Sequence, residues 1–112
     1  MIYRQGDVLI MRVDADQPEY RERTAEARDE GRIVLAYGEV TGHAHAISDE
    51  HATLWRLPGD DRMLTVAGAD VALRHEEHAT ISIPPGAYVV RRQREYVPAA
   101  DDAAPRSTYV AD

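Results

Sequence analysis

Short apolar runs separated by turn residues, at a spacing of about ten residues, constrain the fold of this chain more than any other feature. The runs cover residues 6–13, 32–37, 43–48, 52–57, 62–66, 70–75, 79–83 and 87–93. Strands of this length and spacing are typical of sandwiches and small barrels. A chain of 112 residues is long enough for one core and too short for two. We therefore predict an all-β fold over residues 1–98, a single-domain small β-barrel or sandwich of about eight short strands.

Two acidic segments lie outside these runs. Residues 14–31 carry seven acidic residues against three arginines and have no apolar stripe that would dock firmly on a core. We predict a short exposed helix or a loop insertion there. In the helical alternative Asp16 caps the first turn and Gly31 follows the last. Residues 99–112 carry three acidic residues against Arg106, and we predict a mostly disordered acidic tail.

The composition excludes several chemistries. The chain has neither Cys nor Lys, which rules out disulfides, thiolate metal sites, cysteine nucleophiles, Schiff bases and a P-loop lysine. A formal net charge of −7 makes it a poor candidate for binding nucleic acid or anionic membranes. No apolar run approaches the roughly 20 residues that span a bilayer. No secretory signal is visible, so we expect a cytoplasmic protein without a membrane partner.

The histidines are the most informative polar residues, because all five lie between residues 43 and 78. His43 and His45 are two positions apart on a predicted strand and therefore project from the same face. Ile47 continues that face, which predicts that it points inward. A metal ion would satisfy two neutral imidazoles in an apolar interior, although backbone carbonyls could also hold them. His51 follows two acidic residues in a turn and is predicted to lie on the surface.

Strand parity places the second pair, His75 and His78. The two flanking strands turn their apolar side chains to the same side when Leu73 pairs with Ile81. In that register residues 76–78 form a hairpin loop, His75 points inward and His78 lies at the edge of the loop. The spacing of this pair does not fit a zinc-protease helix, which needs two histidines four positions apart.

These positions together predict a metal site. We expect a divalent transition metal ion (Zn, Fe, Mn or Ni) held by His43, His45 and His75, with His78 or a glutamate as the fourth ligand. One of the glutamates of the 76–78 loop could instead act as a general base beside the ion.

The segment from His43 to Glu50 resembles the first motif of the cupin superfamily, which consists of small β-barrels that hold a metal ion inside. The second cupin motif has its Pro-x-Gly counterpart at residues 84–86, and Val89 stands where that motif has a histidine. The resemblance implies His43, His45 and Glu50 as metal ligands. Other blocks, among them residues 5–9, resemble an uncharacterised family of bacterial and phage proteins, which implies no activity.

A basic cluster covers residues 91–96. On a strand, Arg92 and Arg94 share a face with Tyr88, and we predict that they bind the carboxylate or phosphate of a small-molecule substrate. Alternatively, the cluster is an exposed strand end whose charges prevent edge-to-edge association, or it stacks on single-stranded nucleic acid.

Two classes of function follow. The first is a cupin-like metal-binding protein, with catalysis left open, whose ion would polarise a small oxygenated or anionic substrate or activate water or dioxygen. The alternative is a non-catalytic β-barrel module that binds a protein partner, with a structural metal or none. An open coordination position would indicate an enzyme, and four protein ligands a structural site. We also expect a homodimer, since small sandwiches often close their edges by pairing.

Overall fold

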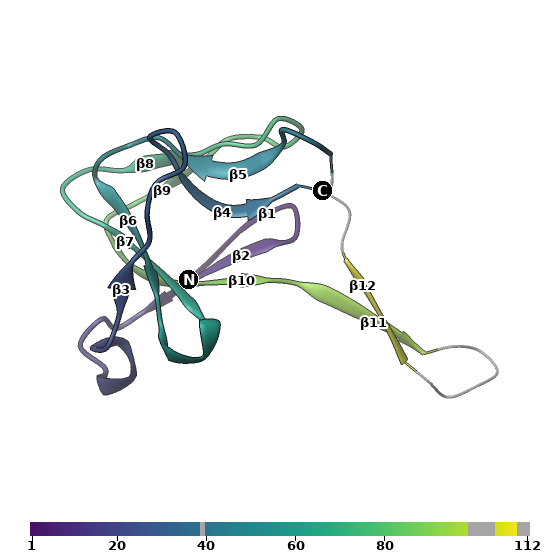
Figure 1. The fold of residues 1–112 in the computed structure, drawn as a ribbon, viewed down its shortest axis with the longest axis horizontal. Helices are drawn as coiled ribbons and strands as arrows, with labels where there is room; N and C mark the ends of the chain where they lie inside the picture. Colours follow the sequence, from purple (N-terminus) through teal and green to yellow (C-terminus); the bar gives the residue numbers. More distant parts are fainter. Residues whose placement is uncertain (39, 99–104, 110–112) are drawn as a thin grey trace.

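The computed structural model describes residues 1–38, 40–98 and 105–109, and strands make up most of it (Figure 1). The larger layer is an antiparallel six-stranded sheet in the order β1-β2-β10-β7-β6-β3. Its strands are β1 (Ile2–Gln5), β2 (Val8–Val13), β10 (Gly86–Arg92), β7 (Arg62–Val66), β6 (Ala52–Arg56) and β3 (Thr24–Ala25). The prediction of an all-β domain is therefore confirmed, and the ladders between the described strands do not close into a barrel.

A second, smaller layer packs against this sheet. It consists of two antiparallel pairs, β4 with β5 and β8 with β9. The strands are β4 (Ile33–Tyr37), β5 (Ala44–Ile47), β8 (Val71–Leu73) and β9 (Ile81–Ile83). Two backbone hydrogen bonds of 2.9 Å between Ala46 and Arg74 join the pairs, so that β5 lies beside the end of β8.

The hydrophobic core lies between the two layers. The larger sheet contributes residues such as Ile10, Leu64 and Tyr88, and the smaller layer contributes Ile47 and Leu73; each is completely buried. Burial of each of these side chains stabilises the fold by roughly 1.5–3 kcal/mol relative to exposure. All four residues of β5 are buried, and Ala44 and Ala46, on its second face, form a small cluster with Val34.

The hairpin between β1 and β2 is important for the site. Gln5 pairs with Val8 across a two-residue turn, and Gly6 has the positive φ of 57° that tight hairpin turns require at this place. The turn brings Asp7 into the interior, where it is 1% exposed. Gln5, at the end of β1, is 2% exposed.

All eight predicted runs contain a strand, with bounds shifted by no more than two residues. The predicted register of Leu73 with Ile81 is also confirmed. The ladder ends at that pair, however, so the predicted three-residue hairpin is instead a longer connection over residues 74–80. Strand β1 was not predicted from the sequence.

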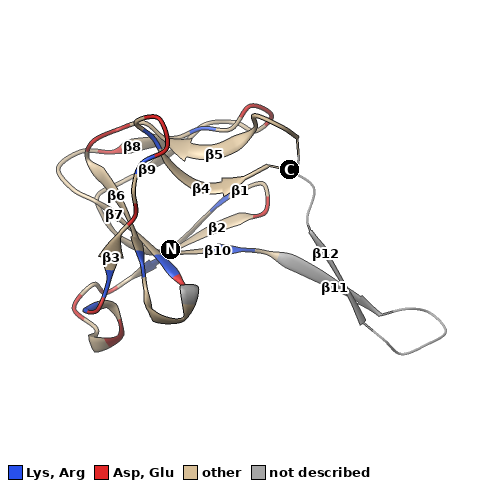
Figure 2. Ribbon diagram, viewed as in Figure 1, with Lys and Arg blue, Asp and Glu red and all other residues tan. Residues whose placement is uncertain are grey.

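The acidic segment 14–31 is a loop, not an α-helix. It contains one 3-10 turn, η1 (Pro18–Tyr20), and strand β3. Gln17, and not Asp16, precedes the turn, and no side chain caps it. A second 3-10 turn, η2 (Pro58–Asp60), connects β6 with β7. Figure 2 shows that the acidic residues are concentrated on such loops.

The end of the chain forms a separate hairpin of β11 (Arg94–Pro98) and β12 (Pro105–Tyr109). The predicted disordered tail at 99–112 therefore includes a strand, and its other residues, 99–104 and 110–112, lie outside the described residues. Within the described part of the chain, no helix is long and apolar enough to cross a membrane.

Candidate metal centre

Four of the five histidines gather where β5 begins and β8 ends. The ring centroids are 5.8 Å apart for His43 and His75, 4.3 Å for His45 and His75, 4.8 Å for His75 and His78, and 6.0 Å for His45 and His78. Two imidazoles on one tetrahedral zinc ion have centroids roughly 5 Å apart, given Zn–N bonds of about 2.1 Å. The four histidines named as candidate ligands thus lie close together, whereas His51 is exposed and its Nδ1 lies 2.6 Å from Asp49.

Gln5 clamps the loop that carries two of these histidines. Its Nε2 donates hydrogen bonds to the carbonyl oxygens of Leu73 and Ala79, at 2.9 Å and 3.0 Å. These two residues lie at the two ends of the 74–80 loop, and they are 68 and 74 positions from Gln5 in the sequence. One buried amide from the first strand therefore fixes the width of the loop.

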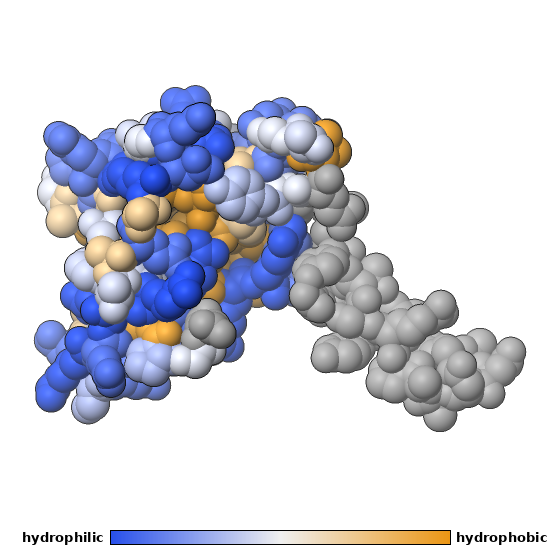
Figure 3. All heavy atoms as spheres, viewed as in Figure 1, coloured by the Kyte–Doolittle hydropathy of each residue, from blue (hydrophilic) through white to orange (hydrophobic). Residues whose placement is uncertain are grey.

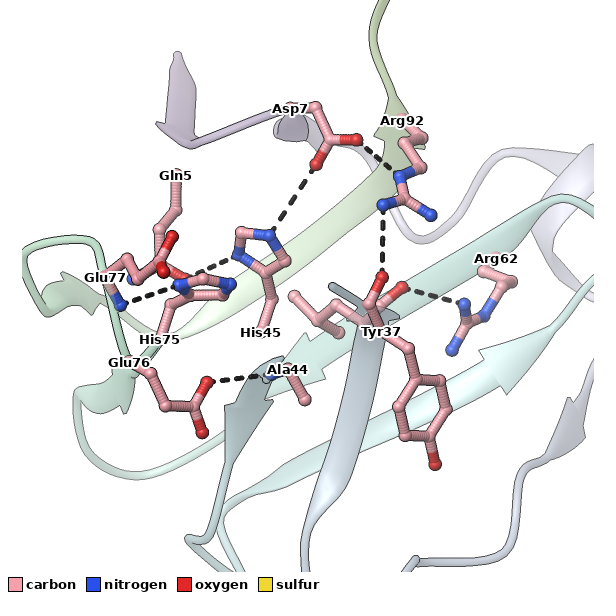
Figure 4. A network of polar contacts seen from close by, with 11 residues as sticks. Gln5, Asp7, Tyr37, Ala44, His45, Arg62, His75, Glu76, Glu77 and Arg92 are labelled. Carbon is pink, nitrogen blue, oxygen red and sulfur yellow. Dashed lines mark hydrogen bonds and ion pairs between the residues drawn. The ribbon is translucent and has the colours of Figure 1, made fainter. Parts of the chain in front are cut away.

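The side-chain amide of Gln5 also determines which ring nitrogen of His45 carries a proton. His45 is completely buried. Because the Gln5 nitrogen faces two carbonyls, its oxygen is the acceptor, and His45 Nδ1 donates to it at 2.9 Å. His45 Nε2 lies 3.6 Å from the Oδ1 atom of Asp7 (Figure 4). Both ring nitrogens of His45 therefore face protein groups, and the ring supports the cluster by packing on His75.

Asp7 connects the cluster with β10. Its Oδ2 atom accepts a 2.5 Å hydrogen bond from Nε of Arg92. The Nη2 atom of Arg92 donates to the carbonyl oxygen of Tyr37 (Figure 4). Arg92, predicted to bind substrate, is thus engaged in holding β4 and the β1–β2 turn. Arg94 begins β11, and only its backbone belongs to the described structure.

His75 is held from the loop side. The backbone N–H of Glu77 donates to its Nδ1 at 3.0 Å, which leaves the proton of the neutral ring on Nε2. Nε2 of His75 is buried and has no hydrogen-bond partner among the described residues, and the same holds for Nε2 of His78. Buried ring nitrogens of this kind need an explanation, since buried polar atoms are usually satisfied.

Glu76 is the carboxylate that accompanies the histidines. His43, His75 and Glu76 each provide one potential ligand atom, and these atoms lie within 4.8 Å of one another. The backbone N–H of Ala44 donates to Glu76 Oε1 at 2.9 Å and lowers the pKa of this carboxyl. Glu76 is thereby kept ionised and aimed at the start of β5.

Glu50, the ligand that the cupin resemblance implies, occupies a different place. It is exposed in the turn between β5 and β6 and belongs to none of the ligand groups found among the described residues. The sequence alone allowed a glutamate as the fourth ligand, or a glutamate of the 76–78 loop as a general base, but it indicated Glu50 and not Glu76 as a ligand. The position of Glu76 directly after His75 was the available signal.

One cavity borders the histidine cluster, and a larger cavity is lined by none of its residues. The cavity of about 330 Å³ borders His75 and Glu76 and is lined further by Arg32 and Arg74. The larger one, of about 620 Å³, lies between the layers, with apolar residues such as Leu54 at its base and charged residues at its rim. Figure 3 shows an apolar hollow with hydrophilic surroundings on this face of the molecule.

The described residues define a two-layer all-β protein with a histidine and glutamate cluster in its smaller layer. Residues 4–93 match the family described as "Domain of unknown function (DUF8820)", and the chain belongs to this family. No curated protein and no solved structure matches the chain. The matched range contains the whole histidine cluster and ends before β11.

Proposed function

We propose that this chain binds a divalent transition metal ion through His43, His75 and Glu76. The observation that carries the proposal is the 4.8 Å grouping of their potential ligand atoms. Ligand atoms on one tetrahedral zinc ion are roughly 3.4 Å apart. The ligand atoms must therefore move closer together on binding, and the exposed Glu76 and the half-buried His43 have room to rotate.

The surroundings of the three residues support this assignment. His43 Nδ1 lies 3.6 Å from a carboxylate oxygen of Glu77, and an acid on the outer nitrogen is the usual partner of a ligating histidine. His78 supplies a buried Nε2 close to His75 and is the candidate for a fourth ligand. His45 acts as a positioning residue in this proposal, because Gln5 and Asp7 face its two nitrogens.

Binding through His75 Nε2 has a structural consequence. That nitrogen carries the proton of the neutral ring, so metal coordination moves the proton to Nδ1 and breaks the bond from the Glu77 N–H. We therefore expect the backbone of the 76–78 loop to change on metal binding. The backbone amide of Glu77 reports this directly.

With His43, His75 and Glu76 as the protein ligands, one position of a tetrahedral ion stays open, and it is closed only if His78 binds as well. Two histidines and one carboxylate are the protein ligands of several catalytic zinc sites and of non-haem iron sites, both of which keep positions for water or substrate. Such an ion polarises a bound oxygen or lowers the pKa of a bound water. The cavity beside His75 and Glu76 supplies room for that additional ligand. A non-catalytic interaction module would need no such open position.

The experiment is a metal titration of the chelator-treated full chain with Zn²⁺ and Fe²⁺, read by competition with a chromophoric chelator and by elemental analysis. We expect one ion per chain. His75→Ala should weaken binding by more than about a hundredfold, since even the loss of an outer partner costs 10–100-fold. His51→Ala is the matched control and should bind like the wild type.

The carboxylate assignment has its own pair of variants. Glu76→Gln should weaken binding, whereas Glu50→Gln should not. The reverse result would support the ligand set implied by the cupin resemblance. Absence of binding by the folded wild-type chain would refute the proposal and favour the interaction module.

A further inference from the structure

The cavity of about 330 Å³ has a defined construction on the outer face of the smaller layer. Alternate residues of β5, Ala44 and Ala46, form its floor, and Ser48 follows them at the same spacing. Methyl side chains at these positions leave the hollow open. His75 and Glu76 border it, so the candidate metal centre and the cavity are contiguous.

Two arginines line this cavity from the elements on either side of β5. Arg32 directly precedes β4, where two backbone hydrogen bonds with Asp29 hold it. Arg74 directly follows β8, where two backbone hydrogen bonds with Ala46 hold it. Both guanidinium groups are thus carried on backbone that the fold positions.

Neither guanidinium forms an ion pair with a carboxylate among the described residues, although the chain carries 20 acidic residues. Arg56, Arg62 and Arg92, by contrast, are each paired with an acid. Glu76 is the acidic residue that lines the cavity, and in the proposed site its charge is taken up by the metal ion. The cavity then has a strong excess of positive charge.

We infer that this cavity binds a small oxyanion, a carboxylate or a phosphate, between Arg32, Arg74 and the metal ion. Guanidinium groups match these anions with paired N–H donors. The hydroxyl groups of Ser48 and Thr80, which also line the cavity, add neutral donors. Its volume is at the lower end of the roughly 300–1,000 Å³ of small-molecule sites, so the ligand is small. This inference rests on the proposed function, because the ion supplies one side of the anion site.

The test uses the full chain loaded with Co²⁺, whose visible spectrum responds to a new ligand. Acetate and methylphosphonate are the two anionic probes, and acetamide is the uncharged counterpart of acetate. We expect a saturable spectral change with at least one anion and none with acetamide. The anion that produces half of the spectral change at the lower concentration (the midpoint) shows whether the site prefers a carboxylate or a phosphate group.

The arginines are tested by Arg32→Gln/Arg74→Gln, with Arg4→Gln/Arg21→Gln as a control that removes the same charge from two exposed positions. The first pair should raise the anion midpoint about tenfold or more, because charged hydrogen bonds are lost. The control pair should leave it unchanged, and both should bind Co²⁺ like the wild type.

The outcomes separate the two proposals. If Co²⁺ binds but no anion changes the spectrum, the anion site is refuted and the metal centre stands. An equal anion response in the wild type and the Arg32/Arg74 variant also refutes it, because the anion then binds the ion without the arginines. If Co²⁺ does not bind the folded chain, the proposed function fails and the anion site fails with it.

Discussion

Replacement of Gln5 tests whether the candidate metal centre depends on the buried hydrogen bonds that hold the 74–80 loop and His45 in place. The side chain is 2% exposed and makes three hydrogen bonds, to the carbonyls of Leu73 and Ala79 and from Nδ1 of His45. Gln5→Leu keeps a similar volume and leaves these three groups without their partner. A buried polar group without a partner costs about 1–3 kcal/mol.

We expect Gln5→Leu to lower the free energy of unfolding by about 3 kcal/mol, since local relaxation recovers part of the full cost of three groups. The 74–80 loop then loses the contact that holds its two ends. Metal affinity should therefore fall by about tenfold or more, as it does for loss of outer partners elsewhere.

The assay is urea denaturation followed by the fluorescence of Trp55, the only tryptophan, together with the zinc titration. Gln17→Leu is the matched control, because Gln17 is exposed and its side chain caps nothing. It should change stability by less than about 0.5 kcal/mol. A Gln5→Leu variant that is as stable as this control, or that binds zinc like the wild type, would refute the proposed clamp.

Three further predictions follow. Arg92→Leu should cost about 3 kcal/mol of stability, because it leaves the buried carboxylate of Asp7 without its ion pair; urea denaturation measures this. Gly38→Ala should weaken zinc binding, because the new Cβ would lie 3.0 Å from Cβ of His43. Burial raises the pKa of Tyr88 above 10.0, so the folded state keeps a proton that the unfolded chain releases. Stability should then fall as the pH rises above 10, and Tyr88→Phe should reduce this fall.

Arg92→Leu has a control variant, and each of the three predictions has a result that would contradict it. Arg56→Leu removes an exposed paired arginine and should have little effect; an equal loss in both variants would contradict the role of burial. Unchanged zinc affinity in Gly38→Ala would show that His43 is not confined there. If Tyr88→Phe and the wild type lose stability in parallel above pH 10, another group causes the pH dependence.

The sequence predicted much of the fold because strand signals are local. Alternation of apolar residues and the turn residues between the runs identified eight strands, and parity alone identified the pairing of Leu73 with Ile81. Strand β1 was not predicted, because its four residues include Arg4 and Gln5 and show no alternation of apolar side chains. Its position beside β2 depends on the turn at Gly6.

The candidate site divides in the same way. The sequence could predict that His43 and His45 share a face of one strand and that His75 points inward. It could not predict that the four histidines meet, because this depends on β5 lying beside the end of β8. The sequence also could not decide whether Glu76 or Glu50 is the carboxylate beside the histidines, because each of these glutamates is next to a histidine in the sequence. The structure distinguishes the two glutamates, because the backbone N–H of Ala44 holds the side chain of Glu76 at the cluster.

The sequence by itself thus determined the strands, the register of the hairpin beneath His75 and the residue types available for a metal ion. The tertiary structure alone decided that Gln5 holds the 74–80 loop across 68 and 74 positions, and that Arg32 and Arg74 line one cavity. The physical reason is that periodicity records which face of a strand is buried. The partner across a buried contact depends on how the layers pack, and no local pattern encodes it.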